Sequence, residues 1–424
     1  MTYKVITLGC KLNYCESAAI EKSFDENGYT NAGDGKADIY IVNSCAVTST
    51  AVTKARHMLS KCKRENPNCV TVLCGCFPQS YPEEAGLKFG ADIVTGNADK
   101  SKLPALVAEY MENRIKTVKI KPLTREYDVE SAVPDEDRTR AFLKIEDGCD
   151  RFCSYCIIPT ARGRVRSLPL EKITEQAAQC VADGHHEIVL TGINLGCYGQ
   201  DLGLRLSDAL KAVEKSGVER IRLSSLEPEM ITDDEIAKFS EVKGLCPHFH
   251  LSLQSGSDTV LKRMNRKYDA KQYKHVVEGL RKAFPTCAIT TDIIVGFPGE
   301  TDEEFIQSVD FAREIGFAKI HVFPYSMRKG TVAAEMEQVH PSIKSERVQL
   351  LTAAAKELEL AFYETQIGTE HTLLVEKPQS REYSHGFTES YIPVRIYGVD
   401  LPRHTLVDIK ITEYRDGYCI GVVI

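Results

Sequence analysis

Three cysteines near the middle of the chain have a spacing that suits a metal centre. They follow the pattern C-x3-C-x2-C and are Cys149, Cys153 and Cys156. A closed structural zinc site takes four ligands, whereas three thiolates can hold three irons of a 4Fe-4S cube. The fourth iron would then be open to chelate a small molecule. A zinc site completed by His185 or His186 is the alternative interpretation.

A second set of three cysteines follows the ends of predicted strands. Short apolar runs at residues 3–8, 39–43 and 70–74 alternate with helical patterns, which is typical of a doubly wound parallel sheet. The cysteines just beyond these runs are Cys10, Cys45 and Cys76. Because the carboxyl ends of parallel strands share one edge, we expect the three thiols to converge there. Cys74 competes with Cys76, which we favour because its Gly-Cys dipeptide repeats the one at Cys10.

The rest of the chain predicts two further domains of the α/β architecture. A second strand–helix alternation predicts a partial (β/α)6 barrel, with strands at 141–146, 187–191, 220–224, 248–253, 288–295 and 319–323. After a long helix at 342–363, short alternating runs at 372–376, 391–396, 405–414 and 418–424 predict a small C-terminal β-barrel. The expected units are therefore an N-terminal domain 1–114, a linker 115–140, a barrel core 141–366 and a β-domain 367–424.

Composition narrows the class of protein. Fifteen cysteines, without a basic and apolar leader, indicate a reducing cytoplasm in which clustered cysteines are metal ligands. No apolar run of membrane-spanning length is present, so we expect no membrane partner. The formal net charge of -7 means that a nucleic-acid partner cannot be inferred from overall charge, and any basic surface must be local. We expect no DNA partner.

With the barrel context, the central loop resembles that of the radical S-adenosylmethionine (SAM) superfamily. In that superfamily the open iron binds SAM, and an electron from the cluster cleaves SAM to methionine and a 5′-deoxyadenosyl radical. Five further segments follow in the superfamily's order, namely LTGINLG, SSLEP, HLSLQSGSD, MNRKY and TTDIIVGFPGET. The resemblance implies that SAM is bound by Gly192, Asn194, Glu227, Ser252, Gln254, Arg266 and Val295. Taken singly, each of these residues could equally have a structural role, such as forming a salt bridge or carrying a solvated charge.

Over its whole length the chain resembles the methylthiotransferases of that superfamily. The resemblance implies two 4Fe-4S clusters, SAM, and a C-terminal domain of the TRAM type. The cluster of Cys149, Cys153 and Cys156 would generate the radical, and that of Cys10, Cys45 and Cys76 would present sulfur for methylation by a second SAM. A radical is needed because the target C–H bond has no useful acidity. A reductant such as flavodoxin or ferredoxin would supply the electron.

The opening LGCKLNYCES and the stretch CIIPTARGRVRS are similar to the branch that acts on threonylcarbamoyladenosine. This branch implies a tRNA substrate and methylthiolation of N6-threonylcarbamoyladenosine at C2, next to the anticodon. The alternatives are isopentenyl-adenosine in tRNA and an aspartate of a ribosomal protein.

Candidate RNA contacts are the cations beside the radical loop, Arg162, Arg164 and Arg166. The C-terminal segment 367–424 holds six Lys/Arg and eight Asp/Glu, so it is net acidic, and RNA binding there rests on resemblance alone. A non-catalytic iron–sulfur protein that binds RNA is a competing hypothesis. A zinc hydrolase is a weaker one, because no H-E-x-x-H pattern is present.

Overall fold

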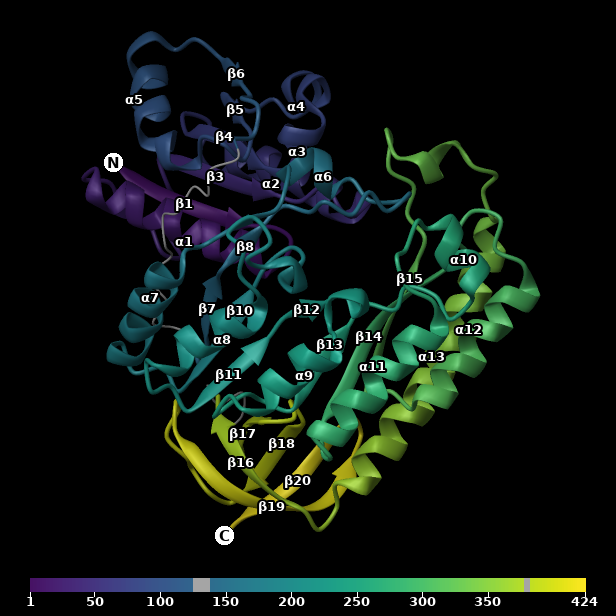
Figure 1. Cartoon of the computed structure of the whole chain (residues 1–424). Coiled ribbons are helices and arrows are strands. Elements are labelled where there is room, and N and C mark those ends of the chain that lie inside the picture. Colours follow the sequence, from purple (N-terminus) through teal and green to yellow (C-terminus); the bar gives the residue numbers. More distant parts are fainter. Residues whose placement is uncertain (125–137, 377–381) are drawn as a thin grey trace.

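The computed structural model of the protein describes residues 1–124, 138–376 and 382–424. Figure 1 shows three parts in chain order: an α/β sheet domain, a strand–helix core and a small barrel at the C-terminus. In the part of the chain that the structure describes, no helix is long and apolar enough to cross a membrane.

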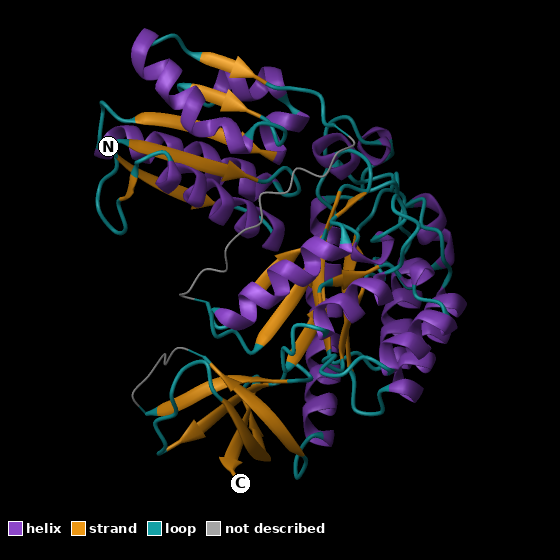
Figure 2. Cartoon of the chain, turned by 60° about the vertical axis from the view of Figure 1, so that its left-hand side comes forward, coloured by secondary structure: helices purple, strands orange, loops and turns teal. Residues whose placement is uncertain are grey.

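The N-terminal part is built on one parallel sheet with the strand order β2-β1-β3-β4-β5-β6. Its strands are β1 (Thr2–Thr7), β2 (Thr30–Asn31), β3 (Ile39–Ser44), β4 (Val70–Gly75), β5 (Ile93–Thr95) and β6 (Thr117–Lys119). Its helices are α1 (Lys11–Glu26), α2 (Ser49–Glu65), α3 (Cys76–Ser80), α4 (Pro82–Lys88), the short 3-10 turn η1 (Lys100–Lys102) and α5 (Leu103–Asn113). Every residue of β3 and β4 is buried, because helices cover both faces of these central strands. Figure 2 shows these helices above and below the strands.

The core alternates strands and helices around a curved sheet that does not close. One sheet has the order β11-β10-β7 and the other β12-β13-β14-β15, all parallel, with a two-stranded pair β8-β9 beside them. The strands are β7 (Ala141–Lys144), β8 (Glu146–Asp147), β9 (Arg166–Ser167), β10 (Glu187–Thr191), β11 (Arg220–Leu223), β12 (Ser225–Leu226), β13 (His248–Leu251), β14 (Ala288–Val295) and β15 (Lys319–Pro324). This arrangement confirms the predicted partial barrel.

Helices cover the outer face of this core because their apolar sides pack on the strands. They are α7 (Leu170–Ala182), α8 (Leu206–Glu214), α9 (Asp233–Ser240), α10 (Asp258–Arg263), α11 (Ala270–Ala283), α12 (Asp302–Ile315) and α13 (Pro341–Thr365). The short helix α6 (Ile158–Arg162) instead packs against α3 of the N-terminal part. Three 3-10 turns complete the set: η2 (Leu195–Cys197), η3 (Pro228–Met230) and η4 (Val332–Glu335). The long helix α13 runs from the core down to the C-terminal barrel (Figure 1).

The C-terminal part is a closed five-stranded barrel with the order β16-β17-β18-β20-β19. Its strands are β16 (Glu370–Val375), β17 (Tyr383–Thr388), β18 (Pro393–Tyr397), β19 (Leu406–Arg415) and β20 (Tyr418–Val423). The predicted β-barrel is confirmed. Strand β17 was missed, because Ser384, His385 and Gly386 interrupt its apolar pattern.

The connection between the first two parts differs from the prediction at one point. Residues 117–119, which we placed in a linker, form strand β6 and pair in parallel with β5. The segment TVK lies at the edge of the sheet, where a strand needs only one partner and little apolar character. Residues 125–137 of the predicted linker lie outside the described part of the chain.

Candidate metal centres and SAM site

The first trio of cysteines lies at one edge of the N-terminal sheet. Cys10 precedes α1, Cys45 directly follows β3, and Cys76 begins α3 directly after β4. Strands β1, β3 and β4 are neighbours, so their ends bring the three residues together. Gly9 has a φ of +123°, and a Cβ placed on it would lie 2.9 Å from the Cys45 Cβ, which shows how closely the Cys10 loop approaches Cys45.

The turn between β4 and α3 places Cys76 rather than Cys74 at this edge. Gly75 has a φ of +99°, and a Cβ there would lie 2.5 Å from the Ser44 carbonyl oxygen. Cys74 is fully buried within β4 and packs in the core with Ile41. Cys76, and not Cys74, therefore lies at the edge of the sheet where it could serve as a ligand beside Cys10 and Cys45.

Nitrogen donors lie beside two sulfurs of this trio, those of Cys45 and Cys76. The Val47 backbone N–H donates to the Cys45 Sγ at 3.3 Å. The Asn97 side-chain amide lies 3.7 Å from the Cys76 Sγ and donates to the Ala161 carbonyl at 2.7 Å. Burial raises the pKa of the Cys45 thiol to about 11, so this thiol ionises at neutral pH only when a cation binds it. Hydrogen bonds to sulfur also tune iron–sulfur clusters.

The second trio lies in the loop between β8 and α6, at the carboxyl end of the first core strands. It consists of Cys149, Cys153 and Cys156. The Arg151 N–H donates to the Cys149 Sγ at 3.4 Å, and the Asn194 amide lies 3.7 Å from the same atom. The Arg266 guanidinium donates to the Cys153 Sγ at 3.3 Å. Burial raises the pKa of Cys149 to about 11, so these thiols also require a cation.

The structure disagrees with a zinc site completed by a histidine. His185 and His186 precede β10, whereas the cysteine loop lies beyond its other end, so about five residues of strand, roughly 16 Å, separate them. Across the described ranges, just one group of three possible metal-binding residues has all its donor atoms within 4.8 Å of one another. That group is His250, Asp292 and His321. The thiols of each trio are spread more widely than one ion at about 2.3 Å from each sulfur allows.

Asn194, one of the residues that the resemblance implies for SAM binding, lies beside Cys149. The Asn194 N–H donates to the Glu146 Oε2 at 2.8 Å. Among the described residues, neither the Glu146 Oε1 nor the Asn194 Oδ1 has a hydrogen-bond partner, although both are buried. An ammonium group placed there would satisfy them, so the site fits a SAM amino group. A Cβ at Gly192 would lie 2.5 Å from the Glu146 Oε2, so Gly192 makes room for this carboxyl group.

A second group of predicted SAM contacts gathers around Arg266. Its guanidinium pairs with the Glu227 carboxylate and lies 3.3 Å from the Ser252 carbonyl oxygen. Burial raises the pKa of Glu227, although Arg266 opposes this shift. Since Arg266 also contacts Cys153, the structure brings these residues to the rim of the cysteine loop.

Gln254 and Val295 lie on neighbouring strand ends. Gln254 has a φ of +68°, a conformation that non-glycine residues adopt rarely and that recurs at functional sites. Its N–H donates to the Asp292 carbonyl at 2.9 Å, and its own carbonyl accepts from the Ile294 N–H at 2.9 Å. Val295 is buried, and its carbonyl accepts from the Tyr325 N–H.

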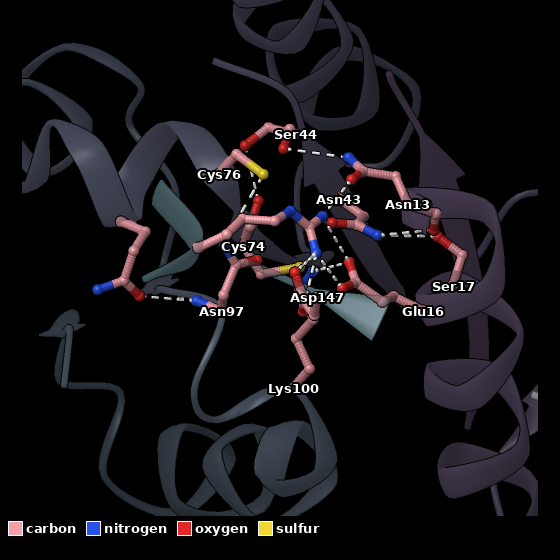
Figure 3. A network of polar contacts seen from close by, with 12 residues as sticks. Asn13, Glu16, Ser17, Asn43, Ser44, Cys74, Cys76, Asn97, Lys100 and Asp147 are labelled. Carbon is pink, nitrogen blue, oxygen red and sulfur yellow. Dashed lines mark hydrogen bonds and ion pairs between the residues drawn. The ribbon is translucent and has the colours of Figure 1, made fainter. Parts of the chain in front are cut away.

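A buried ionic network joins the two halves of the site (Figure 3). The Arg162 guanidinium donates to Glu16 of α1 at 2.5 Å, to Asp147 at 3.2 Å and to Asn13 at 2.8 Å. Only 1% of the Arg162 side chain is exposed. The pKa of Glu16 is lowered well below its usual value: burial alone would raise it, but Arg162 and two lysines outweigh burial. Because Glu16 and Asn13 belong to the N-terminal part, the network holds the two cysteine loops in place.

These contacts correct part of the RNA prediction. Arg162 is buried against carboxylates, and Arg166 is buried between Asp147 and the Thr124 carbonyl. Neither side chain is available to a phosphate on the surface, because both point into the protein and form ion pairs with Asp147. Arg164 alone of the three is exposed, with an ion pair to Asp150.

Several residues of the site were not predicted. Glu146 and Asp147 stand directly before the cysteine loop, and two adjacent acids at a strand end were a signal that the sequence offered. Glu16 and Asn97 had no such signal: Arg162, the partner of Glu16, is 146 residues away in the chain, and Ala161, one partner of Asn97, is 64 residues away.

The fold and site define a radical SAM enzyme with an additional three-cysteine domain, and comparison with known proteins agrees. The family model of the Radical SAM superfamily matches residues 143–312, and that of the Uncharacterized protein family UPF0004 matches residues 2–96. The structure of the radical SAM methyltransferase TsrM from Kitasatospora setae shares the fold, with a TM-score of 0.58, 12% identity and coverage of 76% of this chain and 72% of that chain.

Similar sequences extend over nearly the whole chain. The threonylcarbamoyladenosine tRNA methylthiotransferase MtaB of Bacillus subtilis is 40% identical over 98% of this chain and 96% of its own. The tRNA-2-methylthio-N(6)-dimethylallyladenosine synthase of Pelotomaculum thermopropionicum is 34% identical over 89% of this chain and 87% of its own. The chain belongs to the family of radical SAM methylthiotransferases.

Proposed function

We propose that this enzyme methylthiolates C2 of N6-threonylcarbamoyladenosine in tRNA. The observation that carries the proposal is the 40% identity, over 98% of the chain, to a relative named for this substrate. The placement of both cysteine trios at strand ends joined by one buried network supports the same chemistry. The dimethylallyl branch is the second candidate, because a relative of that name is 34% identical.

Each trio would hold one 4Fe-4S cluster. Burial raises the pKa of the Cys45 thiol in the first trio and of the Cys149 thiol in the second, so these thiols require a cation, and neither trio has the spacing of a single-ion site. Cys149, Cys153 and Cys156 would hold a cluster that would supply the electron for cleavage of SAM, and Cys10, Cys45 and Cys76 would hold one that would present the sulfur. A small redox protein such as flavodoxin or ferredoxin would deliver the electron.

The protein side chains would orient SAM. Glu146 and Asn194 have buried acceptors that would receive its amino group, and the paired Glu227 and Arg266 would bind a ribose hydroxyl and a carboxylate. Gln254 and Val295 would shape the adenine side through their backbone. Arg164 remains the proposed RNA contact of its run.

Two measurements test the proposal. Anaerobic reconstitution should give about eight irons per chain, as two cubes of four, and 5′-deoxyadenosine from SAM and dithionite. Replacing Cys149, Cys153 and Cys156 by alanine should remove about four irons and abolish the product. As a matched control, Cys287→Ala removes a buried thiol outside both trios and should change neither quantity.

Substrate identity requires tRNA from a strain that lacks the chain. Nucleoside mass spectrometry should show that the methylthio derivative of threonylcarbamoyladenosine is lost and that its precursor accumulates. Loss of the methylthio-dimethylallyl nucleoside instead would assign the enzyme to the second branch. An unchanged tRNA profile would contradict both assignments and point to a ribosomal protein.

A further inference from the structure

The lumen of the core encloses a cavity of about 370 Å³. Strands β11, β13, β14 and β15 line it on one side, and the C-terminal barrel closes its floor with Phe387 and Tyr391. From the N-terminal part, Lys11 lines the same cavity. Lys11 directly follows Cys10, so one residue of the first cysteine trio is the immediate chain neighbour of a residue that lines the cavity.

The cations at the floor of the cavity are already paired. Arg140 and Arg222 donate to the Glu187 carboxylate at 2.9 Å and 2.6 Å, and Arg220 lies 3.5 Å from the same group. The remaining N–H groups of Arg222 donate to the carbonyls of Thr388 and Glu389. These arginines therefore bind the C-terminal barrel to the core.

Lys11 differs from these arginines. Its charged neighbours include Arg222, Arg140 and Glu187. The Glu187 carboxylate is already ion-paired with both arginines. Within the described ranges 1–124, 138–376 and 382–424, the Lys11 ammonium has no hydrogen-bond acceptor and no ion-pair partner. Lys319, which also lines the cavity, is paired with Glu359 at 3.5 Å. Lys11 is an exposed residue, so its ammonium is accessible from the cavity, and an accessible, unpaired ammonium beside other cations offers a site for an anion.

We propose that Lys11 binds the carboxylate of the threonyl group of the substrate and so selects threonylcarbamoyladenosine over uncharged N6 substituents. This inference rests on the proposed function. Positions C2 and N6 of adenine flank N1 on one edge of the ring. Cys10 would help to present sulfur to C2. Its neighbour Lys11 would therefore lie on the side toward which the N6 substituent extends. A dimethylallyl group has no charge and would leave the ammonium unpaired.

The test compares methylthiolation kinetics on two synthetic anticodon stem–loops, one with the free threonyl carboxylate and one with its methyl ester. Wild-type enzyme should show a KM for the ester about 10–100-fold higher, as expected for loss of a hydrogen bond to a charged group. Lys11→Gln should raise the KM for the free acid by a similar factor and leave that for the ester unchanged. Lys11→Arg should retain most of the preference.

Lys319→Gln is the matched control, because it removes a paired cation of the same cavity and should change KM by less than about threefold. Iron content and 5′-deoxyadenosine formation without RNA should be unchanged in Lys11→Gln. Equal KM values of the wild-type enzyme for acid and ester would overturn the proposal without any variant, as would an equal loss on both substrates in Lys11→Gln. If wild-type enzyme converts neither stem–loop, the proposed function itself fails.

Discussion

Replacement of Arg162 by methionine tests whether the buried network holds the two halves of the site together. The substitution keeps an unbranched side chain but removes the hydrogen bonds to Glu16, Asp147 and Asn13. Breaking a buried ion pair costs about 3–5 kcal/mol when a charge is left uncompensated. Here Lys144 still pairs with both carboxylates, at 2.9 Å and 2.7 Å. We therefore expect the lower end of the range, about 3 kcal/mol.

The measurement is urea-induced unfolding of the reconstituted full-length protein under anaerobic conditions. Arg164→Met is a matched control two residues away, because 61% of the Arg164 side chain is exposed and its pair with Asp150 lies at the surface. The control should lose less than about 1 kcal/mol. Arg162→Met should also retain less iron, since Arg162 is a charged neighbour of Cys76. A loss in Arg162→Met no larger than that in the control would refute the reasoning.

Two further predictions concern pH and backbone geometry. Burial alone would raise the pKa of Glu187, but Arg222 and Arg140 outweigh burial and lower the pKa to about 2. The ionised Glu187 should therefore stabilise the folded protein by about 3 kcal/mol above about pH 4.3. This contribution should be lost as the pH falls toward 2. Urea midpoints from pH 7 to pH 3 should fall less steeply in Glu187→Gln, and parallel curves would contradict this. Gly75→Ala should lower the stability by about 1–3 kcal/mol and reduce bound iron, because its φ is +99° and the new Cβ would meet the Ser44 carbonyl. Gly28→Ala, with a φ of +79° in open space, should cost about 1 kcal/mol and no iron, and equal iron loss in both would refute the role of the turn.

The sequence was a good guide to the fold where the apolar pattern was continuous. β10 begins and ends where the pattern predicted, because a buried parallel strand is apolar on both faces. β14 also has its predicted bounds, since apolar residues flank its central Thr-Thr-Asp on both sides. The pattern failed at the edges. β6 contributes only three residues, and β17 has small and polar residues at positions where a barrel strand needs less apolar surface. Edge and barrel strands are held by their backbone partners, which a local pattern does not encode.

The site was predictable only as far as local signals reached. Cysteine spacing and strand ends placed both trios, since ligand type and the end of a parallel strand are local properties. Whether each arginine is buried or exposed is not decided by the local sequence. Arg162 and Arg164 are two residues apart and equally basic, yet one is buried and the other exposed, because α6 ends against Glu16 of a helix 146 residues earlier. A run of cations can therefore serve the interior as readily as an RNA surface.

The charges of the buried network also bear on what the first trio binds. Four cations, Lys100, Lys144, Arg162 and Arg166, share two carboxylates, those of Glu16 and Asp147. Burying such a surplus of positive charge is costly unless an anion lies nearby. Burial would lower the pKa of Arg162, but Cys76, Glu16 and Asp147 raise it, so a thiolate at Cys76 would supply part of the missing negative charge. The network would then favour ionised cysteines and the metal they hold, and loss of its cations should weaken iron binding at Cys76 before it affects the loop of Cys149.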